Sequence, residues 1–212
     1  MDHETRTEIA QKLDPERAAR VIRSIGQIET DFFYAAGHLS ERMMAEAFLS
    51  IEKVVKAPWL LIENEWATQV LAPEWKMARG VGTGDMWLEV SEISADEEGI
   101  EHTWLAAATK TVPSMLCIAV VFRRGLQSHA QALIRDDKVV APLWEKGFAR
   151  DEENATLLLP VHVPAEKLAQ GFEKNDLTSA AAPFGKAMAQ ALAAKPALDA
   201  LLEQVRAVAK SK

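Results

Sequence analysis

The sequence predicts an α+β fold with N-terminal helices, a four-stranded antiparallel meander extended by a fifth strand, and a helical C-terminal tail. Three observations support this prediction. Apolar residues between Ile28 and Val54 recur every three or four positions, as on an amphipathic helix. Short alternating or apolar runs between Trp59 and Phe122 are separated by turn residues, as in consecutive strands. The segment after Val163 is rich in alanine, which favours helix.

Length and composition are consistent with one globular domain. The chain has 212 residues, of which 49% are hydrophobic and 26% charged. It contains no long polar linker and no internal repeat. We therefore expect a single α+β domain over residues 1–212. Residues 1–14 are expected to be frayed, and 164–212 are expected to form a helical tail that packs on the sheet or on a partner.

The charge and the apolar runs exclude several protein classes. A formal net charge of -7 disfavours nucleic-acid binding, which needs a basic surface. The longest apolar run, Met115–Phe122, is too short to cross a bilayer, and the charged N-terminus has no secretory signal. The one cysteine, Cys117, lies in that run, so it is expected to be buried and unreactive. We expect a cytoplasmic protein that does not associate with a membrane.

The N-terminal region is expected to form two or three helices. Asp14 precedes a proline, which is a strong helix start, and Gly26 is a plausible stop. A second helix over about 27–56 contains Gly37. Either the helix is continuous or Gly37 breaks it, and the unbroken apolar phase favours one helix. Pro58 is expected to end it.

The central region is expected to supply the meander. Trp59–Leu71 alternates as one half-buried strand, Met86–Ile93 as a second, and His102–Thr109 as a third. Met115–Phe122 is apolar on both faces and is predicted to be the central strand. Helices are expected to pack on one face of this sheet.

The remaining elements follow the central strand. Thr156–Val163 is predicted to be the fifth strand, and Pro160 places it at an edge or at a bulge. The predicted helices after the meander cover Leu126–Ile134, Val139–Phe148, 165–173, 178–194 and 196–209.

An acidic, tryptophan-rich segment is the first candidate site. Residues 59–111 hold five of the six tryptophans. They also hold ten acidic and three basic residues, and the resulting local charge of -7 equals the net charge of the whole chain. Charges at alternate strand positions are typical of the solvated side of a sheet. They also fit a surface for a cationic partner, in which exposed Trp75 or Trp87 would anchor the contact. The predicted partner-binding residues are Glu63, Glu65, Trp87 and Glu89. No ligand loop has the regular spacing of a metal site.

Two basic loops that contain glycines are the second candidate. The loops are Lys76–Gly84 and Arg123–Gly125. The second loop directly precedes a predicted helix, whose free N–H groups favour an anion. The alternative is that the arginines pair with the acidic residues nearby. The predicted anion-binding residues are Arg79, Gly80, Gly82, Gly84, Arg123 and Arg124.

The loop RGVGTG resembles the RGxGxG pyrophosphate-binding loop of GNAT acyltransferases, and Ala141–Phe148 resembles a later element of that family. The resemblance implies that the amides of the loop hold acetyl-CoA and that Glu63 or Glu65 acts as a base. That family places a helix after the loop, whereas Asp85–Ile93 alternates as a strand. The cofactor is otherwise unassigned.

Glu74-Trp75-Lys76 is similar to the E-x-K half of a PD-(D/E)XK nuclease site, which gives a second enzymatic alternative, a divergent metal-dependent nuclease. The five histidines show no metal-ligand spacing, and no G-x-S-x-G nucleophile motif is present. The sequence therefore does not identify an enzyme. It favours a binding or interaction protein that uses the acidic sheet or the basic loops.

The amphipathic helices are the third candidate. The stripes over 28–55 and 198–208 exceed what one modest sheet can cover, so they are candidates for a homodimer or partner interface. The alternative is that they pack on the sheet and on each other.

Overall fold

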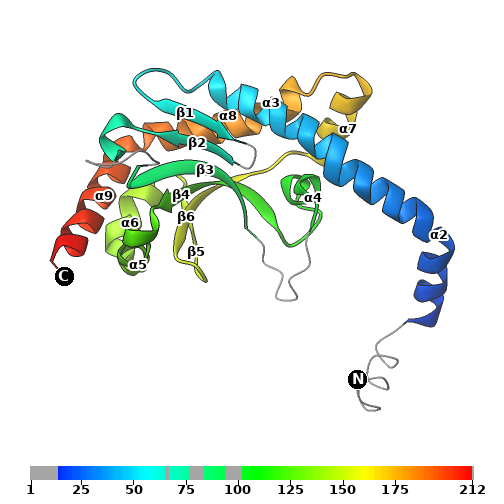
Figure 1. Cartoon of the computed structure of the whole chain (residues 1–212), viewed down its shortest axis with the longest axis horizontal. Coiled ribbons are helices and arrows are strands. Elements are labelled where there is room, and N and C mark those ends of the chain that lie inside the picture. Colours follow the sequence, from blue (N-terminus) through cyan, green and yellow to red (C-terminus); the bar gives the residue numbers. More distant parts are fainter. Residues whose placement is uncertain (1–13, 65–66, 77–83, 94–101, 212) are drawn as a thin grey trace, which may run out of the picture.

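The computed structural model describes residues 14–64, 67–76, 84–93 and 102–211. It has the predicted α+β architecture, with N-terminal helices, one antiparallel sheet and C-terminal helices (Figure 1). The strands lie in the order β1-β2-β3-β4-β6-β5. Their bounds are β1 (Leu60–Asn64), β2 (Ala67–Leu71), β3 (Met86–Ile93), β4 (Met115–Phe122), β5 (Ala149–Asp151) and β6 (Thr156–Val161).

The N-terminal helical elements follow one another without a break. They are α2 (Pro15–Tyr34), the π-helical turn η1 (Ala35–Leu39) and α3 (Ser40–Glu52). The Asp14 carboxylate accepts hydrogen bonds from the amides of Glu16 and Arg17 at 3.0 and 3.1 Å, which confirms the predicted cap.

The two glycines of this region do not end helices. The predicted stop at Gly26 is wrong, because α2 continues through it, and a glycine within an otherwise helical pattern is only a modest penalty. Gly37 lies in the π-helical turn η1, in which backbone hydrogen bonds span five residues instead of four, and the helix then continues as α3. The prediction of a continuous helix is therefore confirmed.

The predicted strand over 59–71 is wrong in one respect, because it is a hairpin. β1 and β2 pair antiparallel, with Leu60 opposite Leu71 and Asn64 opposite Ala67. Each arm alternates with period 2, but the register pairs Leu61 with Val70 on one face and Ile62 with Gln69 on the other, so the alternation changes phase where the chain reverses. β1 to β4 form a four-stranded antiparallel meander, as predicted, but two of its strands come from the predicted 59–71 strand and none comes from 102–109.

The predicted strand over 102–109 is a helix, α4 (Trp104–Thr109). Thr103 Oγ1 accepts a hydrogen bond from the Ala106 amide at 3.2 Å and caps it. The Trp104 ring stacks on Phe184, with 5.5 Å between ring centroids. The cap, the alanines and this stacking together favour a helix over the strand suggested by tryptophan and threonine.

The fifth predicted strand, β6, pairs with β4 on one side and with the short edge strand β5 on the other. β6 is therefore not the edge strand of the sheet, but β5 pairs only with Thr156, Leu157 and Leu158, so the predicted open edge is present at Pro160. Pro160 lies beyond Leu158, the last β6 residue paired with β5, so its missing N–H removes no bond to that neighbour.

The helices after the sheet begin with α5 (Arg124–Ile134) and α6 (Asp137–Trp144), and the tail holds α7 (Ala165–Glu173), α8 (Thr178–Ala193) and α9 (Lys195–Lys210). α8 lies along α3, and the approach is close at Gly185, whose amide donates to Ser50 Oγ at 3.2 Å. A Cβ at Gly185 would lie 2.6 Å from the Ser50 carbonyl oxygen.

The main core lies between the helices and one face of the sheet. It takes alternate residues of β3 from Met86 to Val90 and of β4 from Leu116 to Phe122, and the apolar stripe of α9. The buried α9 residues are Leu198, Leu201, Leu202 and Val205, so most of that predicted interface stripe is used within the fold. The other face of the sheet carries a smaller cluster around Cys117, Ala119 and Leu158.

Candidate functional site

The predicted anion-binding loop is described only in part. Arg79, Gly80 and Gly82 lie outside the described residues, and Gly84 and Arg123 are the parts of the prediction that the structure brings close together. Gly84 is buried against the backbone of Trp75, where a Cβ would lie 2.4 Å from the carbonyl oxygen. The next residue, Asp85, donates its amide to that same oxygen at 2.6 Å. The close approach explains the glycine without a ligand.

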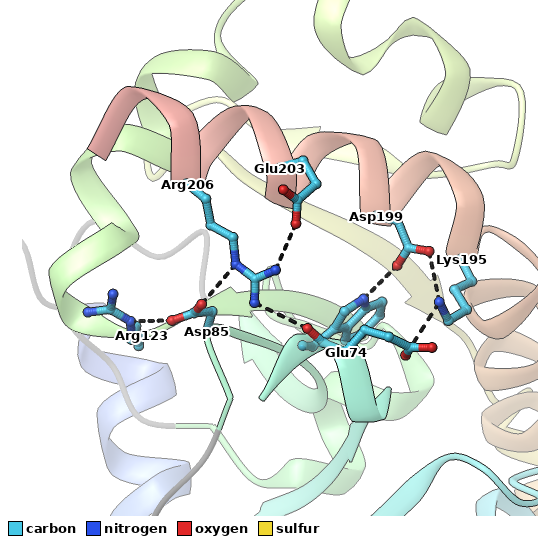
Figure 2. A network of polar contacts seen from close by, with 8 residues as sticks. Glu74, Asp85, Arg123, Lys195, Asp199, Glu203 and Arg206 are labelled. Atoms are coloured by element: carbon cyan, nitrogen blue, oxygen red, sulfur yellow. Dashed lines mark hydrogen bonds and ion pairs between the residues drawn. The ribbon is translucent and has the colours of Figure 1, made fainter. Parts of the chain in front are cut away.

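Asp85 is the centre of the polar network at this place (Figure 2). Its side chain is only 12% exposed. The Arg123 guanidinium pairs with one carboxylate oxygen, and Arg206 Nε donates to the other at 2.9 Å. Because a partly buried carboxylate is costly unless it is paired, the two arginines stabilise Asp85 where it lies.

Arg206 extends the network along α9. Its guanidinium also donates to Glu203 at 2.7 Å and to the Glu74 carbonyl oxygen at 3.2 Å. Burial disfavours its charge, but the hydrogen bonds to Glu203 and Asp85 outweigh burial and raise the pKa of Arg206. Arg206 therefore ties the end of α9 to the 74–85 region.

A second group of contacts lies further along α9 (Figure 2). Lys195 Nζ donates to Asp199 at 2.8 Å and lies 3.6 Å from Glu74. The hydrogen bond to Asp199 raises the pKa of Lys195. The other Asp199 oxygen accepts from the Trp75 indole at 2.7 Å. Trp75 belongs to the 3₁₀ turn η2 (Pro73–Trp75) and is 1% exposed, so the prediction of an exposed Trp75 anchor is wrong.

A surface cavity of about 530 Å³ adjoins this network. Arg123 and Arg206 line this cavity, and both already pair with the Asp85 carboxylate. Arg124 lies exposed at the start of α5. Of the two loop arginines that the alternative expected to pair with nearby acids, Arg123 does so, through Asp85. The lining residues are Glu74, Lys76, Asp85, Arg123, Leu126, Glu203, Arg206, Ala209 and Lys210.

The predicted acidic sheet surface is also described in part. Glu65 lies outside the described residues, and for Glu63 only the backbone position in β1, opposite Thr68, is described. Glu89 is half-buried and accepts hydrogen bonds from the Trp87 indole and the Gln69 amide, both at 2.8 Å. Neutral donors therefore satisfy this carboxylate, and Trp87 is held against it as a half-buried side chain.

Helix α2 offers a different kind of surface. None of its residues is buried, and it leads away from the rest of the fold (Figure 1). No described residue covers its apolar side. The exposed large hydrophobic residues are Val21, Ile22, Ile25, Ile28, Phe32, Phe33 and Tyr34.

The predicted 28–55 stripe thus divides into two parts. Met43, Ala47 and Ile51 of α3 are buried in the main core, whereas Ile28 and Phe32 of α2 are 44% and 48% exposed. The sequence prediction assigned the apolar face of Val21, Ile22 and Ile25 to a separate helix that ended at Gly26, so it did not join that face to the stripe that begins at Ile28. The spacing of Val21 and Ile25 ahead of Ile28 is the signal that extends the stripe.

No family model matches this chain, and searches of curated proteins and of solved structures find no similar protein. Within the described ranges, no three His, Cys, Asp or Glu side chains gather in a way that could hold a metal ion. No helix of the described residues is long and apolar enough to cross a bilayer.

Proposed function

We propose that this protein is an interaction protein that binds another polypeptide through the apolar side of α2. One observation carries the proposal: a helix of 20 residues exposes seven large hydrophobic side chains and buries no residue. By helical spacing all of these except Tyr34 lie on one side of α2, and continuous exposed apolar surface of this kind marks an interaction site in soluble proteins. The cytoplasmic setting predicted from the sequence is part of this proposal.

The stability of α2 supports a bound partner. α2 extends the N-terminal helix by 20 residues beyond the core, and helix stability in proteins comes mainly from packing of an apolar side. Gly26 lies inside α2 and weakens it further, by about 1 kcal/mol relative to alanine. Contact with a partner would supply the packing that the described part of this fold does not.

The charges of α2 favour a polypeptide over a lipid surface. Glu29 lies three or four residues from Ile25, Phe32 and Phe33, so helical spacing places its carboxylate at the apolar side. A carboxylate at that position opposes insertion into the acyl boundary of a membrane. A protein partner can instead leave it at the rim, where it stays hydrated.

The two enzymatic alternatives receive less support. The strand β3 begins at Met86, where the acyltransferase alternative needs a helix. Glu74 lies in the turn η2 and contacts Lys195, whereas the nuclease alternative needs E-x-K on a strand. The anion-binding prediction for Arg79, Gly80 and Gly82 stays a prediction, because these residues lie outside the described ranges.

Photo-crosslinking in cells that produce the full chain tests the proposal. A photoreactive phenylalanine analogue replaces Ile22, which is 69% exposed on the apolar side, and in a matched control it replaces Arg20 on the opposite side. We expect a discrete product of higher mass from position 22 and none from position 20. Equal products from both positions, or no product from position 22, would overturn the proposed function.

A further inference from the structure

We infer that the partner of α2 is a second copy of this chain, bound with its α2 antiparallel to the first. This inference rests on the proposed function and names the partner. It follows from the spacing of the apolar residues in α2 and from the charges that flank them.

The apolar residues of α2 follow the spacing of a two-helix seam. Ala18, Val21, Ile25, Ile28 and Phe32 recur at alternating intervals of three and four residues, the a/d pattern of a coiled coil. Ile22 and Glu29 flank one side of this seam. Arg17, Ser24 and Asp31 flank the other side, at intervals of seven residues.

The charges discriminate between the two orientations of a second copy. In an antiparallel pair, each flanking row meets the same row of the other helix. With the two-fold axis at Ser24, Arg17 of one copy lies opposite Asp31 of the other, and the symmetry repeats the pair. Ser24 is near the middle of Pro15–Tyr34, so this alignment also overlaps the helices almost completely.

In a parallel pair, the Arg17 row of one helix meets the Ile22 row of the other, and no residue lies opposite one of the opposite charge. This orientation places Arg17 opposite Ile22, Ser24 opposite Glu29 and Asp31 opposite Ala36. The charges of α2 therefore complement a second α2 in the antiparallel orientation only.

The placement of α2 allows this dimer. The body of the protein joins the C-terminal end of α2, and α2 leads away from it (Figure 1). Two antiparallel copies therefore hold their bodies at opposite ends of a helix pair about 30 Å long, at 1.5 Å rise per residue. The interface is isologous and closes after two copies, as in most soluble homo-oligomers.

Sedimentation of the full chain measures the oligomeric state. We expect twice the chain mass of 23.4 kDa, and the chain mass itself for Ile25→Glu, which places a carboxylate in the seam. Arg23→Glu adds a carboxylate on the side of α2 opposite the seam and is expected to stay dimeric. Circular dichroism of both variants verifies that the body is folded.

Charge reversal tests the orientation. Arg17→Glu and Asp31→Arg are each expected to weaken the dimer about tenfold, because each replaces two attractive pairs with two repulsive ones. The double variant Arg17→Glu/Asp31→Arg restores the pairs in the antiparallel orientation and is expected to recover the wild-type dissociation constant. A double variant as weak as both singles would overturn the antiparallel arrangement.

A wild-type chain that sediments as a monomer up to hundreds of micromolar would overturn the second-copy inference. The proposed function would then be judged separately by the crosslink at position 22. A product with a different protein would leave the proposed function standing, and the absence of any product would remove both.

Discussion

The Trp75 indole donates a hydrogen bond to the Asp199 carboxylate at 2.7 Å, although the two residues are 124 positions apart in the sequence. This contact joins the turn after β2 to the N-terminal part of α9. The Trp75 ring also packs edge-on against Trp59, with 5.2 Å between centroids. Trp75 therefore connects its own turn with two other segments, the one at Trp59 and the one at Asp199.

Replacing Trp75 with phenylalanine is expected to lower the free energy of unfolding by about 2 kcal/mol, since it removes a hydrogen bond to a charged group and leaves a cavity. Urea denaturation followed by circular dichroism measures the loss. A double-mutant cycle with Asp199→Ala isolates the contact, and a coupling energy near zero would contradict the importance given to it.

Asp85→Ala is expected to destabilise the protein by about 3 kcal/mol, because it leaves Arg123 and Arg206 without the carboxylate that both contact. Arg124→Ala is the matched control. Its side chain is exposed at the start of α5, so the change is expected to stay within about 0.5 kcal/mol. Equal losses in the two variants would show that the Asp85 network does not hold α9 in place.

Cys117 is expected to make the protein less stable at alkaline pH. Burial, with a smaller contribution from the Asp151 charge, raises the pKa of its thiol from 9.0 to about 12. The unfolded thiol ionises first, so stability is full below pH 9 and falls as pH rises toward 12.

At pH 10 this loss is about 1.4 kcal/mol relative to neutral pH, and Cys117→Ala is expected to lack it. Urea denaturation of both proteins from pH 7 to 10 measures the difference. The native thiol should also resist a thiol reagent at neutral pH until the protein unfolds. A rapid reaction in the folded state would contradict the burial of Cys117.

Strong helical periodicity explains why most helices could be predicted from the sequence. The stripe through α9 repeats over several turns, so its period is unambiguous. Short segments are different. Residues 102–109 contain tryptophan and threonine, which favour a strand, beside three alanines and the Thr103 cap, which favour a helix. The stacking of Trp104 on Phe184 adds to the helical signals, and no local pattern encodes that contact.

The polar network around Asp85 likewise depends on contacts between residues that are far apart in the sequence. Arg123 could be selected because it lies in a basic, glycine-containing loop, but Arg206 could not, since it lies 121 positions from Asp85 in an ordinary amphipathic helix. The exposure of α2 was equally hidden. Its apolar spacing is that of a helix packed on a core, and only the arrangement in space shows that no described residue covers it.

Gly84→Ala is expected to destabilise the protein by about 2 kcal/mol or more, because the new Cβ would lie 2.4 Å from the Trp75 carbonyl oxygen. That oxygen also accepts the Asp85 amide, so the backbone cannot move away without losing the hydrogen bond. Gly37→Ala is the matched control. Its Cβ meets no atom within 4 Å, and alanine is favoured over glycine in a helix by about 0.5–1 kcal/mol. Thermal denaturation of the two variants should therefore shift the midpoint in opposite directions, and a shift of the same sign would contradict the close packing at Gly84.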